Sequence, residues 1–350
     1  MKRIIVITSI CLFLFVFLLV YHKNKKNDDL LVHSKELSTP KSATVQVDSQ
    51  NTVVTESEPT NLTITASKQS KIPEIVDFNE PIVKSFPIIK IKLPASPTIT
   101  SRLLPVVTQD SSVLLFERLA ALEKLGKSLT KEEIAAFYEF LNRKDSEIKM
   151  DGDDLDVLKN DISTLLQLQK NKPKYYAHNL MAMFYNQKLS VVWRDYTVQH
   201  LAQWYRKEES SSVRNDIRTL FATALQDTSS SIAGTALIAL DYNIGADGIT
   251  SAYVAKRAVD FVHNPDSGSL TRTTALQIAA QFGQTSILND ARSIAVSREP
   301  VPLRMSAIAA IGMIGSEQDI AMLNQYSLSS DVRLRTAAVA ALKKIRKRKI

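Results

Sequence analysis

Apolar residues in the C-terminal half of the chain return with helical spacing in five successive units. In each unit a small or β-branched residue lies three positions after one reference residue. Aliphatic residues lie four positions and, in most units, seven positions after it, and a bulky apolar residue usually lies ten positions after it. The reference positions are Arg194, Ala233, Arg272, Arg304 and Arg335, which are 39, 39, 32 and 31 residues apart. This spacing gives each helix one apolar stripe, which it can bury only against a neighbour of the same kind. The pattern therefore predicts a stack of amphipathic helices.

The helical pattern extends over residues 111–350. Thr130 and Glu133 form a capping box that opens a helix reaching about residue 143, and Gly126 ends the helix before it. No segment combines β-branched alternation with turn residues as strongly as a sheet requires. The other helices are expected near residues 154–169, 173–186, 190–206, 211–226, 231–243, 249–263, 269–283, 285–297, 302–315, 317–328 and 331–347. Such a run of helices with short connections is ordinary for a solenoid.

Four of the repeated segments carry a family pattern. They read VWRDYTVQHL, SLTRTTALQIAAQFG, VPLRMSAIAAIGMIG and SDVRLRTAAVAALKKI, and the last two show it best, as an aliphatic residue, Arg, two variable residues and Ala. These segments resemble HEAT repeats, and most closely the short HEAT-like repeats also found in phycobilin lyase subunits. The resemblance covers about residues 190–350. The second unit departs from the pattern, because Ala233 stands where the other four units have arginine. It implies an all-α fold, a right-handed α-α superhelix used mainly for macromolecular contacts, and no reaction by itself.

The N-terminus carries a long apolar run. After Met1-Lys2-Arg3, 17 apolar or small uncharged residues extend from Ile4 to Val20. This length is at the lower edge of what spans a bilayer, and the end of the run lacks the small residues that a signal peptidase requires. We therefore expect residues 1–22 to be an uncleaved signal anchor with the C-terminal domain exported to the periplasmic or extracytoplasmic side. Secretion after signal cleavage is the alternative, and lysines on both flanks leave the orientation open.

Residues 23–110 have the composition of a tether. Eight of the twelve prolines lie between Pro40 and Pro105, serine and threonine are dense, and no glycine occurs before Gly126. Such a composition favours an extended, disordered linker over a packed core. The sequence thus predicts three parts: an anchor at 1–22, a disordered linker at 23–110 and a HEAT-like solenoid at 111–350.

The sequence offers little catalytic chemistry. Cys11 is the only cysteine, and the motifs of phosphate-binding loops, nucleophile elbows and zinc proteases are absent. The run from Asp151 to Asp156 lacks the spacing of a calcium loop, because the twelfth position is Ile162. His200 aligns with small or aliphatic residues of the sister units, which predicts a packed rather than a ligating side chain. We therefore predict no catalytic residue, no cofactor, no metal and no enzymatic activity.

Positive charge is concentrated at the C-terminus. Six residues contribute six of the formal net charge of +8, and the rest of the chain is nearly neutral. They are Lys343, Lys344, Arg346, Lys347, Arg348 and Lys349. A nucleic-acid surface would need cations distributed along a face, so we do not expect nucleic acid as a partner. The cluster is expected to be either a solvated end cap or a contact for anionic lipid or another acidic surface.

Two tyrosines are the candidates for a partner contact. Trp193 and Trp204 align with aliphatic or aromatic residues of the sister units, which predicts that both are core. Tyr196 and Tyr205 align mostly with small or polar residues, which predicts exposure. Exposed tyrosines often concentrate interface energy. A larger core volume in this region is the alternative explanation for both.

Taken together, these features predict a membrane-tethered HEAT-repeat scaffold that binds protein partners, with residues 4–20 in the membrane. One alternative is an accessory enzyme or chaperone of the bilin-lyase type, which the resemblance to phycobilin lyase repeats suggests. Another is an envelope tether that recognises polysaccharide through its tyrosine-rich region.

Overall fold

The computed structural model describes residues 99–348, and every element in this part of the chain is helical. The all-α prediction is therefore confirmed for these residues. The predicted anchor at 1–22, most of the predicted linker and Lys349 lie outside the described residues. None of the helices within 99–348 combines the length and hydropathy that crossing a membrane requires.

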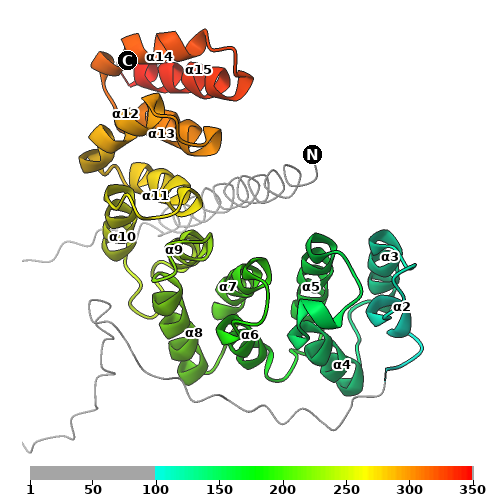
Figure 1. Ribbon diagram of the computed structural model, residues 1–350. Helices are drawn as coiled ribbons and strands as arrows, with labels where there is room; N and C mark the ends of the chain where they lie inside the picture. The colour runs from blue at the N-terminus through cyan, green and yellow to red at the C-terminus, as the bar shows by residue number, and fades with distance from the viewer. Residues whose placement is uncertain (1–98, 349–350) are drawn as a thin grey trace, which may run out of the picture. The chain divides into compact units, whose positions relative to one another are not determined.

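The helices follow one another with short connections (Figure 1). The α-helices are α2 (Leu104–Val107), α3 (Leu115–Leu125), α4 (Lys131–Asn142), α5 (Gly152–Gln167), α6 (Tyr176–Tyr185), α7 (Val191–Tyr205), α8 (Ser211–Ala224), α9 (Ile232–Tyr242), α10 (Ser251–His263), α11 (Ser269–Gln281), α12 (Leu288–Val296), α13 (Val301–Ile314), α14 (Ile320–Ser327) and α15 (Val332–Lys347). Three short 3-10 helices are η1 (Asp145–Glu147), η2 (Thr285–Ile287) and η3 (Glu317–Asp319). Each helix predicted between residues 111 and 347 is present, with ends that differ by a few residues.

The helical region begins earlier than the sequence predicts. Residues 99–110 were assigned to the linker, yet α2 lies there and packs against α3 with Val106 and Val107 buried. Pro105 is compatible with α2 because it stands in the first turn, where its missing N–H costs no hydrogen bond. The fully buried Arg118 of α3 then binds the carbonyl oxygens of Val106, Thr108, Asp110 and Val113 at 2.7–3.2 Å. These hydrogen bonds, which we call the Arg118 clamp, hold α2 and the residues after it against α3, so α2 belongs to the folded region.

Odd-numbered helices form a continuous row. Each of α3, α5, α7, α9, α11 and α13 contacts the next odd-numbered helix (Figure 1). Each of these helices, and α15 as well, also contacts the even-numbered helix before it. We call an even-numbered helix together with the odd-numbered helix after it a unit. The apolar stripe of each odd-numbered helix is buried in one continuous core, which includes Val198, Ala236, Ala275, Ala307 and Ala338.

In three of the units the arginine at the reference position binds the end of the preceding helix or the turn after it. Arg194 Nε donates to the carbonyl of Phe184 at 2.8 Å, at the end of α6, and Arg304 Nε donates to that of Ala295 at 3.1 Å, at the end of α12. Arg335 Nη1 likewise reaches the carbonyl of Ser329 at 2.8 Å. Because the last carbonyls of a helix have no intrahelical partner, an arginine is favoured there. This bond explains why arginine recurs within an otherwise apolar stripe.

Candidate functional site

One side of the odd-numbered helices carries no charge over four successive units. The positions concerned lie two residues before and two, five and nine residues after the reference residue. At about 100° per residue, they fall on the opposite side of the helix from the reference arginine. In α7, in α9 with its N-cap residue, in α11 and in α13 they are Val192, Tyr196, Gln199, Gln203, Ser231, Thr235, Ile238, Tyr242, Leu270, Thr274, Gln277, Gln281, Pro302, Ser306, Ala309 and Met313. We call these sixteen residues the open face.

The open face is accessible for most of its length. All of its residues are half-buried or exposed except Thr274 and Ser306, which are buried. Gln277 Nε2 donates to Ser306 Oγ at 2.9 Å, so α11 and α13 are linked by a hydrogen bond on this side. Arg206, which follows α7, stacks on the Tyr242 ring at 5.1 Å and marks an edge of the face. Protein surfaces are usually rich in charged side chains, so an uncharged stretch of this extent is a candidate binding surface.

Charged residues of these four helices point elsewhere. Arg194, Asp195 and Asp241 are buried. Arg272 pairs with Glu299 at 3.3 Å, and Arg304 binds the end of α12. Each of the four helices therefore contains charged residues, but none of them lies at an open-face position.

Tyr196 lies on the open face near two carboxylates, those of Asp156 and Asp195, that each accept a hydrogen bond from a serine. Ser190 Oγ donates to Asp156 Oδ1 at 2.7 Å, which joins α5 to the N-cap of α7. Ser231 Oγ donates to Asp195 Oδ2 at 2.5 Å, which joins α7 to the residue before α9. Burial, followed by the nearby carboxylates, raises the pKa of the half-buried Tyr196 phenol. Its hydroxyl therefore stays neutral at physiological pH and can donate to a partner.

Two buried titratable groups flank this region. Burial raises the pKa of Asp156 to about 6, against the opposing hydrogen bond from Ser190. Burial lowers the pKa of His200 to about 4, and its Nε2 lies 3.0 Å from Asn160 Oδ1. His200 is only 4% exposed, which confirms that it is packed. The prediction that Trp193 and Trp204 belong to the core is also confirmed.

The expectation that Tyr205 is exposed is wrong. Its side chain is fully buried, with its hydroxyl donating to Asp247 Oδ2 at 2.7 Å and its ring 6.1 Å from that of Phe221. Tyr205 thus faces α8 and the loop after α9 instead of the open face. The alignment with glycines of the later units was misleading because those units lack an equivalent of this polar contact. Tyr205 is therefore withdrawn as a partner contact, whereas Tyr196 stays a candidate.

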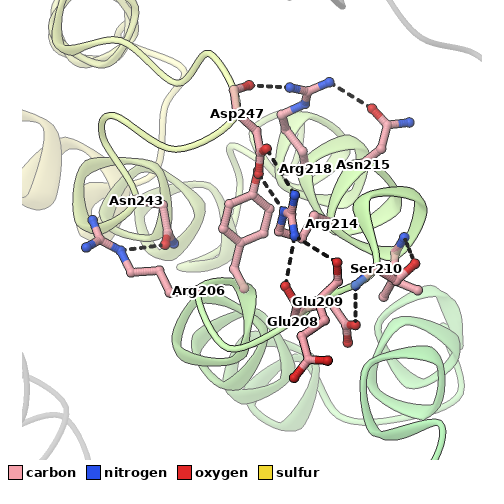
Figure 2. Close-up of polar contacts among 11 residues, drawn as sticks. Arg206, Glu208, Glu209, Ser210, Arg214, Asn215, Arg218, Asn243 and Asp247 are labelled. Atoms are coloured by element: carbon pink, nitrogen blue, oxygen red, sulfur yellow. Dashed lines mark hydrogen bonds and ion pairs between the residues drawn. The ribbon is translucent and has the colours of Figure 1, made fainter. Parts of the chain in front are cut away.

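The contact between Tyr205 and Asp247 belongs to a larger polar cluster (Figure 2). Arg214 Nε donates to Asp247 Oδ2 at 2.9 Å, and Arg218 binds the Asp247 carbonyl. Asp247 has a φ of 44° between two glycines that also have positive φ, a conformation that its surroundings must hold. Although burial alone would raise the pKa of Asp247, hydrogen bonds from Tyr205 and Arg214 and the arginine charges hold it below its ordinary value. The cluster fixes the loop between α9 and α10 against α8.

The basic C-terminal cluster is not uniformly free. Lys343, Lys344, Arg346 and Lys347 are exposed. Arg348, however, donates to the carbonyl oxygens of Gly312 at 2.8 Å and Gly315 at 2.7 Å, and also to that of Met313. Its guanidinium therefore caps α13, although Arg348 is itself exposed. Contact with an acidic surface stays a prediction for these residues.

Comparisons with known proteins assign no family. No family model matches the chain, and no curated protein matches its sequence. Among solved structures, human deoxyhypusine hydroxylase aligns with 70% of this chain and 95% of its own, at 15% identity and a TM-score of 0.26. A likeness this weak assigns neither fold nor function. Within residues 99–348, no group of three or more His, Cys, Asp or Glu side chains is arranged to hold a metal ion.

Proposed function

We propose that this protein is a membrane-tethered scaffold whose HEAT-like solenoid binds a protein partner on the open face, without catalysis of its own. The observation that carries the proposal is the uncharged open face on four adjoining helices of one row. The row of odd-numbered helices, each covered by an even-numbered helix, supports a right-handed α-α superhelix. Residues 1–22 would anchor the protein, with the helical domain exported and residues 23–98 serving as the linker.

The chemistry of the open face favours a protein segment with uncharged side chains. Glutamine, threonine and methionine lose less hydration free energy on burial than charged residues do. The centres of protein interfaces are likewise depleted in charge and enriched in tyrosine and methionine. Tyr196 and Met313 lie on this face, and the glutamines provide both hydrogen-bond donors and acceptors. A partner with many charged residues would leave them unpaired here.

Placing a cation on the open face should therefore abolish binding. We expect Gln203→Lys and Gln281→Lys, each in the full-length protein, to reduce capture of the partner from the protein's own membrane extract at least tenfold. An unpaired charge buried at an interface costs more than the roughly 1.4 kcal/mol that corresponds to tenfold. The matched control is Gln325→Lys on α14, where the exposed glutamine lies off the open face. Equal capture by all three variants, or capture of polysaccharide in place of protein, would contradict the proposal.

Tyr196 provides a second test of the same surface. Tyr196→Ala is expected to weaken capture about tenfold or more, since truncating an interface tyrosine commonly costs roughly 1–2 kcal/mol or more. Helix content measured by circular dichroism should match that of the wild type, because Tyr196 is half-buried. Undiminished capture by a folded Tyr196→Ala protein would remove this residue from the binding surface.

A further inference from the structure

The side of α15 that faces away from α13 repeats a helix-binding surface. In α13 the side toward α15 includes Ile308, which is fully buried, and Gly312, where an added Cβ would lie 2.6 Å from Ala341 of α15. The residues of α15 in the same register are Val339 and Lys343, four and eight residues after the reference arginine. Val339 is 54% exposed. The surface on which the row would continue is therefore present on α15 and is open within residues 99–348.

This surface has two chemically different halves. Val332, Thr336, Val339, Lys343 and Lys347 follow one another at helical spacing and form one stripe. We call these five residues the end face. Val332 is 60% exposed, and with Val339 it makes the first half apolar. The two lysines make the second half basic, and they form no ion pair with any described residue.

We propose that the end face binds an acidic amphipathic helix of another protein, which takes the place of the next odd-numbered helix in the row. The two valines would contact apolar residues of that helix, much as Ile308 is buried beside α15. Lys343 and Lys347 would pair with its carboxylates. A helix is favoured as the occupant because each earlier odd-numbered helix of the row packs against the next odd-numbered helix.

A second copy of this chain is poorly suited to continue the row. To do so, the copy would have to present the free side of α3, on which the equivalents of Leu334 and Ala341 are Glu117 and Lys124, counted from the buried Arg118. Leu334 and Ala341 are buried, whereas Glu117 and Lys124 are exposed. Glu117 also accepts the backbone N–H of Leu114 at 2.8 Å as part of a cap. That side of α3 is therefore polar where packing against the end face would need apolar side chains.

The test uses the full-length protein in its own membranes with a photo-crosslinking amino acid at position 339. Crosslinked peptides are identified by mass spectrometry. We expect a segment of another protein with helical apolar spacing and an excess of Asp and Glu. Combining Lys343→Glu with Lys347→Glu should lower the crosslink yield at least tenfold, whereas Lys256→Glu on α10 should leave it unchanged. All three lysines are exposed, so their substitution should preserve the fold.

Four outcomes would overturn this proposal. They are a crosslink to a second copy of this chain or to its own residues 1–98, a crosslink to lipid, a yield that charge reversal leaves unchanged, and the absence of any crosslink while circular dichroism shows an intact fold. Binding at the open face is measured separately through Gln203 and Gln281. Failure of the end-face proposal would therefore leave the proposed scaffold function untouched.

Discussion

Gly312→Leu is expected to lower the free energy of unfolding by about 3 kcal/mol, because α13 and α15 touch at this residue. A Cβ added to Gly312 would lie 2.6 Å from both Cα and Cβ of Ala341, and backbone atoms cannot yield as a flexible side chain can. Inserting extra methylenes into a packed core typically costs about 1–3 kcal/mol, occasionally more. Urea denaturation followed by circular dichroism would measure the loss as a lower midpoint.

Gly152→Ala is the matched control for this substitution. Gly152 opens α5, and an added Cβ there would meet nothing within 4 Å. Alanine is also the better helix former, so the midpoint should be unchanged or slightly higher. Equal midpoints for Gly312→Leu and wild type would show that α13 and α15 separate at little cost.

Asp156 and His200 should give the protein opposing dependences on pH. The pKa of His200 is lowered to about 4 from 6.5, so between these values the unfolded chain binds a proton that the folded chain does not. This contribution to stability falls as pH drops from 6.5 to 4. The pKa of Asp156 is raised to about 6 from 3.8, so its contribution rises as pH drops from 6 to 3.8. Each contribution amounts to about 3 kcal/mol.

Single substitutions should separate the two contributions. Asp156→Asn keeps an acceptor for Ser190 but removes the cost of a buried charge, so we expect stability at pH 7.5 to rise by up to about 3 kcal/mol. Relative to wild type, this gain should vanish as pH falls to 4. His200→Gln should instead become progressively more stable than wild type over the same acid range. Thermal midpoints measured at half-unit intervals of pH would show the two opposite trends, and parallel curves for all three proteins would contradict the burial argument.

Helix positions could be predicted from the sequence because the buried stripe is a local pattern. The reference arginines also stand out in sequence, although their hydrogen bonds to the preceding helix become visible only in the fold. The start of the folded region was missed because Pro105 in a proline-rich stretch suggested a linker, whereas the first turn of a helix accepts proline. The sequence around Arg118 gives no sign that its side chain is buried and binds the carbonyl oxygens in and after α2.

Candidate site residues were harder to predict, for a physical reason. The direction of the Tyr205 side chain is decided by Asp247, which is 42 residues away along the chain. A rule based on residue spacing within one helix cannot predict a contact between residues so far apart in the sequence. The open face, by contrast, is readable in the sequence once the polar positions of the units are aligned as carefully as the apolar ones. Attention to large aromatics alone identified Tyr196 and missed the glutamines around it.

The arginine bonds within units also bear on how the protein would respond to mechanical tension. Arg194, Arg304 and Arg335 each tie two helices of one unit together, while neighbouring odd-numbered helices meet mainly through apolar packing and a few hydrogen bonds. A chain pulled from its two ends would therefore shed one unit at a time. With units of 31 to 39 residues, each rupture would release roughly 100–140 Å of extended chain. If the tether holds one end at a membrane and a partner holds the other, the stack would yield in steps of that length and would still keep its remaining units folded.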